Sequence, residues 1–146
     1  MREVPVGSKG SFAHTVIEDD LAIKLDASLP AVMATRVMAG MMELAAMDAI
    51  RAYLDAGESS VGIAMDFAHV AATPVGHRVH AEAEVTGCEG RRLEFKVRAF
   101  DESEEIGSGT HRRAVIELAK FNARLKPKLK ATLGDSVPSG NQRESK

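Results

Sequence analysis

The sequence is poor in cysteine, aromatic residues and long apolar runs, and each shortage excludes a class of protein. The 146 residues include a single cysteine, Cys88, which rules out an internal disulfide and a cysteine-rich metal site. Tryptophan is absent, and only five Phe and one Tyr are present. No stretch approaches the roughly 20 apolar residues of a membrane helix. The first ten residues also lack the apolar run of a signal peptide. We therefore expect a cytoplasmic protein with no membrane partner.

Neither sign of charge is in large excess. The chain has 19 Lys and Arg against 21 Asp and Glu, which gives a net charge of −2. Domains that bind nucleic acid are usually strongly basic, so no nucleic-acid partner is expected. The length suits one domain, which we place at residues 1–125. Residues 126–146 have a different composition, with four Lys and one Arg against one Asp and one Glu. We predict that they form a mobile basic tail.

Residues 30–54 have the composition of a long buried helix. Pro30 suits the first turn, and Gly57 stands where a C-terminal cap would follow. Positions 32–49 are apolar on nearly all sides, and such a helix is usually buried. A sheet can cover one side of it. We expect a second subunit to cover the other side, in a homodimer or a larger homo-oligomer.

After Gly57 the apolar residues recur with a period of two, which is typical of strands with one buried face. The alternation covers residues 61–67, 79–85 and 93–99, with turns expected at 73–77, 87–90 and 101–104. A last strand is expected over residues 105–120, where Gly107 and Gly109 allow close backbone approach. Residues 12–17 and 21–25 are weaker strand candidates. The pattern predicts an α+β fold in which a curved antiparallel sheet wraps one long central helix.

Three polar side chains stand where the pattern predicts apolar or small ones. Glu43 lies in the most apolar part of the helix. If it is buried, its pKa rises and it becomes a candidate base or nucleophile; alternatively it reaches solvent or a subunit interface. His69 ends the first alternating strand among small residues, as a proton-transfer group or a structural histidine. Thr35 lies eight residues before Glu43, so one continuous helix cannot bring the two side chains together. They meet only if Thr35 precedes the helix or if they come from different subunits; otherwise Thr35 is an N-terminal cap.

The remaining polar residues give weaker signals. The other histidines are isolated or flank turns, and His111 lies between a glycine-rich stretch and two arginines. No set of His, Asp and Glu has metal-ligand spacing, and there is no phosphate loop, so neither a metal nor a cofactor is expected. Five basic residues could hold the phosphates of a nucleotide-bearing ligand, although a solvated face explains any one of them: Arg91, Arg92, Arg112, Arg113 and Lys120.

Several long stretches resemble one known family. They are ATRVMAGMME at 34–43, AHVAATP at 68–74, EGRRL at 89–93, and IGSGTHRRAVI at 106–116, which continues to KFNA at 120–123. The chain resembles the hot dog fold acyl-CoA thioesterases, in the branch of the fluoroacetyl-CoA thioesterase. The resemblance implies a long helix wrapped by an antiparallel sheet, a dimer with sites at its interface, and hydrolysis of an acyl-CoA to a carboxylic acid and CoA.

The resemblance also implies roles for individual residues. The family's catalytic threonine, glutamate and histidine fall on Thr35, Glu43 and His69, and a substrate-binding glycine and arginine fall on Gly62 and Arg113. The fluoroacetyl-specific enzyme has a phenylalanine-rich segment before the threonine, whereas residues 26–33 contain no Phe. Fluoroacetyl-CoA is therefore not expected as the substrate. Two alternatives stay open: a non-catalytic acyl-CoA sensor, and a hot dog hydratase, which the matched motifs disfavour.

Overall fold

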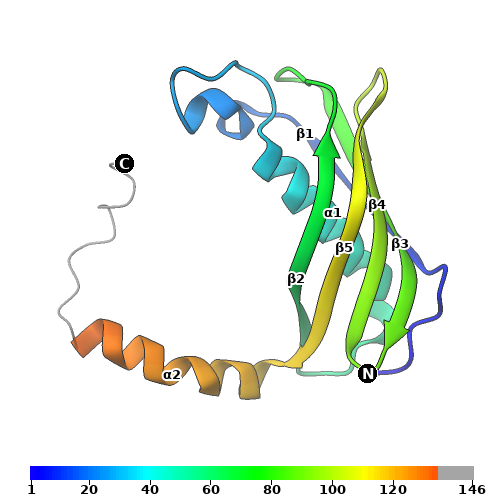
Figure 1. Ribbon diagram of the computed structural model, residues 1–146, viewed down its shortest axis with the longest axis vertical. Coiled ribbons are helices and arrows are strands. Elements are labelled where there is room, and N and C mark those ends of the chain that lie inside the picture. Colours follow the sequence, from blue (N-terminus) through cyan, green and yellow to red (C-terminus); the bar gives the residue numbers. More distant parts are fainter. Residues whose placement is uncertain (135–146) are drawn as a thin grey trace.

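A curved antiparallel sheet wraps one long helix in the computed structural model, which describes residues 1–134 and the side chains of residues 1–129 (Figure 1). The strands are β1 (Lys9–Thr15), β2 (Glu58–His69), β3 (Arg78–Glu89), β4 (Arg92–Phe100) and β5 (Glu105–Glu117). Their order in the sheet is β1-β3-β4-β5-β2, and each neighbouring pair is antiparallel. The predicted fold class is confirmed, and β1 and β2 form the two edges.

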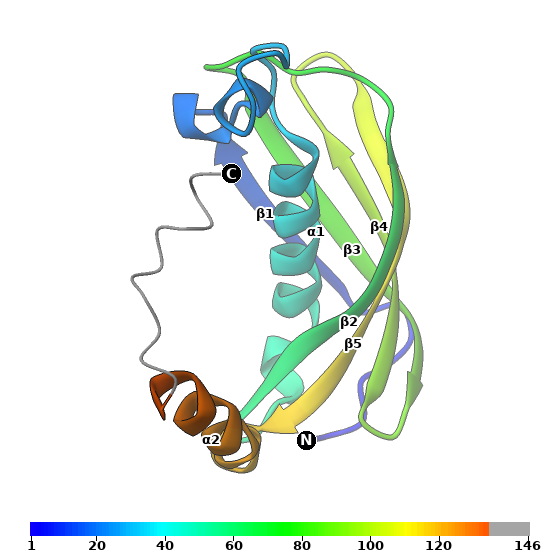
Figure 2. The same ribbon diagram turned by 60° about the vertical axis from the view of Figure 1, so that its left-hand side comes forward.

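The long helix, α1 (Thr35–Ile50), lies in the concavity of the sheet (Figure 2). It is shorter than the predicted range of 30–54 because Ala34 is still extended and because residues 51–53 tighten into the 3₁₀ turn η3 (Arg51–Tyr53). Gly57 was expected to be a helix cap, but it is not one. With φ of +83° it forms the turn into β2, a conformation that favours glycine.

Only one side of α1 is covered by the rest of residues 1–134 (Figure 2). The side toward the sheet is buried, and its residues are Met38, Met41, Met42, Ala45, Ala46, Ala49 and Ile50. On the other side Leu44 is 38% exposed, and Val37 and Met47 are half-buried. The second apolar side that the sequence indicates is thus present, and nothing else in residues 1–134 covers it.

The strands follow the predicted period of two. In β3 and β4 buried and exposed residues alternate along most of each strand, and Phe95 is the largest side chain in the core. Gly107 and Gly109 allow the close approach that was predicted: a Cβ on Gly107 would lie 2.5 Å from the sulfur of Met38, and one on Gly109 would clash with the backbone of β2.

The segment before α1 differs from the prediction. Residues 21–25 are not a strand: Ala22–Lys24 form the 3₁₀ turn η2, and Leu21 separates it from a preceding 3₁₀ turn, η1 (Glu18–Asp20). The Asp20 carboxylate favours the turn because it accepts hydrogen bonds from the backbone N–H of Ile17 and from His14 Nε2, at 2.9 and 2.6 Å. Of the predicted strand, Leu21 alone forms a single bridge, with Met33.

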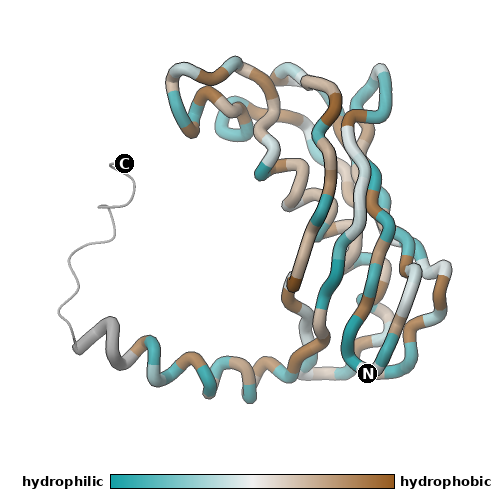
Figure 3. The backbone as a smooth tube through the Cα atoms, in the orientation of Figure 1, coloured by the Kyte–Doolittle hydropathy of each residue, from teal (hydrophilic) through white to brown (hydrophobic). Residues whose placement is uncertain are grey.

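A second helix, α2 (Leu118–Gly134), follows β5 and projects away from the sheet (Figures 1 and 3). The sequence pattern predicts no helix here and a last strand that reaches Lys120, whereas β5 ends three residues earlier, at Glu117. Helix α2 runs across the predicted domain boundary at 125. Residues 135–146, which make up the rest of the predicted tail, lie outside the described residues. Within residues 1–134 no helix is long and apolar enough to cross a bilayer.

Candidate active site

Thr35 and His69 form a hydrogen-bonded pair at one end of the molecule. Thr35 is the first residue of α1, His69 is the last residue of β2, and Thr35 Oγ1 lies 2.9 Å from His69 Nδ1. Thr35 is not the N-terminal cap considered above, because that position belongs to Ala34. Burial lowers the pKa of His69 below its ordinary value, and a backbone hydrogen bond with Ala71 opposes this only in part. The imidazole is therefore neutral near pH 7.

The backbone that carries Thr35 is fixed from both sides. The N–H of Met33 donates to the carbonyl of Thr73 at 2.8 Å, and the N–H of Ala34 donates to the carbonyl of Asp20 at 2.9 Å. Thr73 is fully buried, and its hydroxyl donates to the Asp101 carboxylate at 2.8 Å. The start of α1 is thus tied to the turn between β4 and β5, which limits the positions that the Thr35 hydroxyl can take.

Glu43 is ion-paired with Arg113 in the middle of the concave face. Arg113 Nη1 lies 3.1 Å from Glu43 Oε2; the arginine side chain is 4% exposed and the glutamate side chain 42%. Arg113 also donates from Nε to the Ser60 hydroxyl and from Nη2 to the Ser60 carbonyl, at 2.8 and 3.0 Å. Burial lowers the pKa of Arg113, and the charge of Glu43 opposes that shift. Within one chain, Glu43 therefore presents one carboxylate edge to solvent while a buried cation orients it.

His111 supports this ion pair, a role that was not predicted from the sequence. Its ring is buried, with Nδ1 2.8 Å from the carbonyl of Ala64 and Nε2 3.2 Å from Arg113 Nη1. Burial lowers the pKa of His111, so the ring is neutral. A neutral ring with these partners donates from Nδ1–H and accepts at Nε2, which directs the guanidinium toward Glu43. The available signal was the alternation in β5, which places His111, Arg113 and Val115 on one buried face.

Gly62 leaves the space that the Glu43 carboxylate fills. A Cβ at position 62 would lie 2.5 Å from Glu43 Oε2, too close for the carboxylate to stay in place. We expect Gly62→Ala to fold, because the obstructed atom is the end of a flexible side chain. The carboxylate must move, however, so turnover of a thioester should fall by about tenfold or more. Gly87→Ala is the matched control, since its Cβ would meet only Glu94 at ordinary contact distances. Unchanged turnover in Gly62→Ala would show that the position of the Glu43 carboxylate does not matter for the reaction.

In one chain the predicted site residues form two groups rather than one. Thr35 pairs with His69, while Glu43 lies with Arg113 and Gly62. Eight residues of continuous helix separate Thr35 from Glu43, a rise of about 12 Å and a rotation of about 80°. The sequence allows the two side chains to meet in two ways. The first, in which Thr35 precedes the helix, is ruled out because Thr35 is already helical. Different subunits remain.

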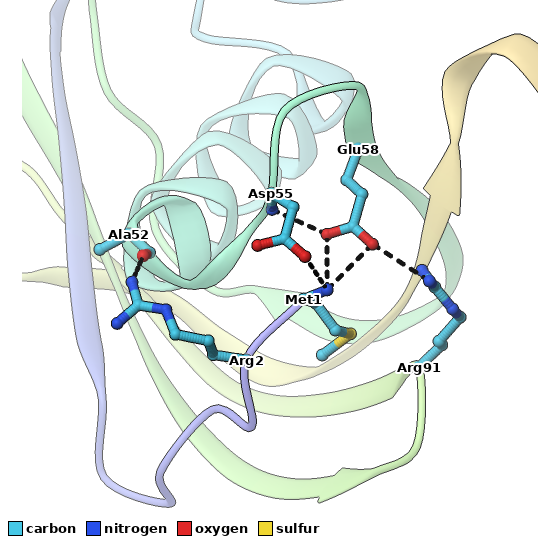
Figure 4. Close-up of polar contacts among 6 residues, drawn as sticks. All are labelled: Met1, Arg2, Ala52, Asp55, Glu58 and Arg91. Atoms are coloured by element: carbon cyan, nitrogen blue, oxygen red, sulfur yellow. Dashed lines mark hydrogen bonds and ion pairs between the residues drawn. The ribbon is translucent and has the colours of Figure 1, made fainter.

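Arg91, a candidate for binding phosphates, is instead part of an ion-pair cluster at the start of β2 (Figure 4). Its Nη2 lies 3.1 Å from the carboxylate of Glu58, which also binds the Met1 ammonium group at 3.0 Å. The backbone N–H of Asp55 and then the Met1 ammonium lower the pKa of Glu58 to about 2. The cluster fixes the turn into β2. Within the described part of the chain, no group of three or more His, Cys, Asp or Glu could hold a metal ion.

Comparison with known proteins agrees with this architecture. The model of the fluoroacetyl-CoA-specific thioesterase family matches residues 16–119. The fluoroacetyl-CoA thioesterase of Streptantibioticus cattleyicolor is 50% identical over 105 residues, which are 72% of this chain and 76% of that protein. A solved structure of a threonine-to-serine variant of such an enzyme, in complex with acetyl-CoA, is 42% identical with a TM-score of 0.81. It covers 85% of this chain and 98% of its own.

A more distant structure supports the same fold. A thioesterase superfamily member from Thermus thermophilus is 30% identical, with a TM-score of 0.82 over 90% of this chain and 99% of its own. The order of the strands, the helix in the concavity and the matched sequence all point the same way. The chain therefore belongs to the fluoroacetyl-CoA-specific thioesterase family and is a thioester hydrolase with the hot dog fold.

Proposed function

We propose that this protein hydrolyses small to medium acyl-CoA thioesters at sites shared between the two subunits of a homodimer. Each site combines the Thr35–His69 pair of one subunit with the Glu43–Arg113 pair of its partner. The observation that carries the proposal is the division of the site residues into two groups that one chain cannot bring together. CoA esters are intracellular metabolites, which suits the predicted cytoplasmic location, and no cofactor besides the CoA of the substrate is required.

Two unpaired surfaces support the dimer. Among the described residues β2 pairs only with β5, so its other edge offers free backbone N–H and C=O groups. Beside it lies the uncovered side of α1, with Leu44 exposed and Val37 and Met47 half-buried. A second copy would satisfy the strand edge and bury this apolar side at once.

A two-fold axis requires the two β2 strands to pair in antiparallel fashion. Seven residues, or about 23 Å of strand, separate Gly62 from His69. A register that places Gly62 opposite the partner's His69 brings the partner's Thr35–His69 pair to Glu43. It does the same at the second site by symmetry, so one register completes both.

The chemistry follows from this arrangement. Glu43 either takes a proton from a water whose oxygen attacks the thioester carbonyl carbon, or attacks that carbon itself. The carbon–sulfur bond then breaks and the thiolate of CoA takes up a proton. Where Glu43 is the nucleophile, water then hydrolyses the anhydride left on its carboxylate, which releases the carboxylic acid and restores Glu43. Thr35 and His69 share a hydrogen bond through which a proton can reach the thiolate or leave the water. The backbone N–H of Gly62, next to the β-bulge at Ile63, is the candidate donor to the oxyanion.

The acyl group is limited by the segment before Thr35. Residues 26–33 are exposed up to Ala31 and contain no aromatic side chain. Leu29 in this segment and Leu25 just before it are 37% and 71% exposed. Aliphatic side chains give an adaptable apolar wall without the shape selectivity of a rigid ring. We propose broad use of acyl groups up to medium length, without selectivity for fluoroacetyl-CoA.

Thiol release from a panel of acetyl-, butyryl-, phenylacetyl- and longer acyl-CoA esters tests the activity, with an enzyme-only blank for Cys88. We expect turnover of several members, and fluoroacetyl-CoA, assayed beside them, should show no advantage over acetyl-CoA. Thermal stabilisation by acyl-CoA without turnover would identify a sensor. Neither stabilisation nor turnover would exclude simple CoA esters as ligands.

A further inference from the structure

Helix α2 carries an apolar stripe that the other described residues leave exposed. Leu118, Phe121, Leu125 and Leu129 recur every three or four residues, which places them on one side of a helix. Leu118, Leu125 and Leu129 are 44%, 37% and 58% exposed. In Figures 1 and 2 the helix points away from the sheet and from α1. Nothing else in the described part of the chain packs over this stripe, so a second copy of the chain is a candidate to cover it.

Helix α2 also depends on a partner for its stability. Pro127 lies inside it and donates no backbone hydrogen bond, which interrupts the ladder at its middle. Helices of this length are marginal in water unless an amphipathic face is packed. The proposed dimer offers such packing.

The other sides of α2 are basic. Residues 118–129 contain no Asp or Glu, and their four basic residues are Lys120, Arg124, Lys126 and Lys128. CoA carries a phosphate on its ribose and a diphosphate, so its nucleotide end is strongly anionic. Arginine and lysine are the side chains that bind phosphate groups best. Of the sequence-based candidates, Arg91 and Arg113 bind Glu58 and Glu43. Lys120 lies 3.5 Å from Glu117 at an exposed position of α2.

The root of α2 lies where the proposed dimer places the partner's site. The N–H of Leu118 donates to the carbonyl of Gly57 at 2.9 Å, directly before the first residue of β2. In an antiparallel pair of β2 strands, the beginning of one strand lies toward the end of the other, which is the partner's His69. The exposed Leu25 and Leu29 of the partner subunit lie in the segment that precedes its α1 and offer an apolar surface at the same end.

From this placement we propose that α2 of each subunit lies across the mouth of the partner subunit's site and binds the phosphates of the CoA held there. The proposal rests on the shared site of the proposed function. It assigns the nucleotide end of the substrate to one subunit and the Thr35–His69 pair beside the thioester to the other.

The double variant Arg124→Gln/Lys126→Gln tests the proposal with two substrates, an acyl-CoA and the matching acyl-pantetheine, which lacks the nucleotide. We expect KM for the acyl-CoA to rise about tenfold at unchanged kcat, and less at high salt, because phosphate contacts are screened. KM for the acyl-pantetheine should not change. Lys9→Gln/Lys96→Gln is the control, since it removes the same charge from exposed positions on β1 and β4.

An unchanged KM for acyl-CoA would overturn the proposal, and so would an equal rise for both substrates or an equal rise in the control. The wild-type protein distinguishes a failure of this proposal from a failure of the proposed function. If it hydrolyses neither substrate, the affinity for CoA itself, measured by calorimetry, decides: weaker binding by the double variant alone supports the α2 site, and equal binding overturns it.

Discussion

Glu43→Gln is expected to lower thioester turnover by about a thousandfold while the protein stays folded, because the loss of a general base or nucleophile costs several orders of magnitude. The amide keeps the size of the carboxylate, and its oxygen still accepts a hydrogen bond from Arg113 Nη1. It cannot accept a proton from water or form a reactive carboxylate. Thiol release under single-substrate saturation gives kcat, and thermal unfolding reports stability in the same samples.

The choice of substitution decides what this experiment means. Glu43→Ala would leave the buried guanidinium of Arg113 without its carboxylate, a loss of about 1–3 kcal/mol in unfolding free energy. A dead Ala variant therefore confuses chemistry with stability, whereas Gln separates them. Asp48→Asn is the matched control, since Asp48 lies on the same helix and is also paired with an arginine, Arg51 at 2.8 Å. A folded Glu43→Gln protein that keeps more than about a tenth of wild-type turnover would remove Glu43 from the reaction.

The parts of the fold that sequence predicted well are those fixed by local periodicity. Residues 79–85 and 93–99 alternate apolar and polar residues, and both lie in strands with one buried face. The long helix is predicted from its apolar composition instead, although its ends are not. Pro30 suits a first helical turn and Gly57 a C-terminal cap, but Pro30 lies five residues before the start of α1 and Gly57 forms the turn into β2.

The features that sequence missed depend on contacts between distant residues or on surfaces outside the chain. Helix α2 has a proline inside it, which weakens its local helix propensity, and its apolar stripe becomes visible only once the end of β5 is known. His111 is separated from Glu43 by 68 positions, and only the register of β5 beside β2 brings it to the ion pair. The residue pattern singles out Thr35, Glu43 and His69 as candidates, but only the family resemblance joins them in one catalytic set, since the spacing of Thr35 and Glu43 argues against contact along one helix.

Complementation between two inactive variants is the second large effect expected. In a heterodimer of Glu43→Gln and His69→Ala chains, one site combines the intact Thr35–His69 pair of the first chain with the intact Glu43 of the second. The other site lacks both groups. We expect each variant alone to be nearly inactive, and heterodimers purified through two different tags to show about half the wild-type rate per dimer, because one of two symmetric sites is whole.

The opposite result has an equally definite meaning. If Thr35, His69 and Glu43 acted within one chain, every chain in the heterodimer would lack one of them and no activity would return.

The interface itself is checked with Leu44→Glu, which places a charge on the exposed apolar side of α1 and should halve the mass seen by sedimentation. Val6→Glu is its control, since Val6 is 68% exposed and precedes β1, at the opposite edge of the sheet from β2. Thr35 and Glu43 lie about 12 Å apart along α1, the rise of eight helical residues. A monomer that keeps full activity would therefore exclude the shared site, because no second subunit would be present to bridge that distance.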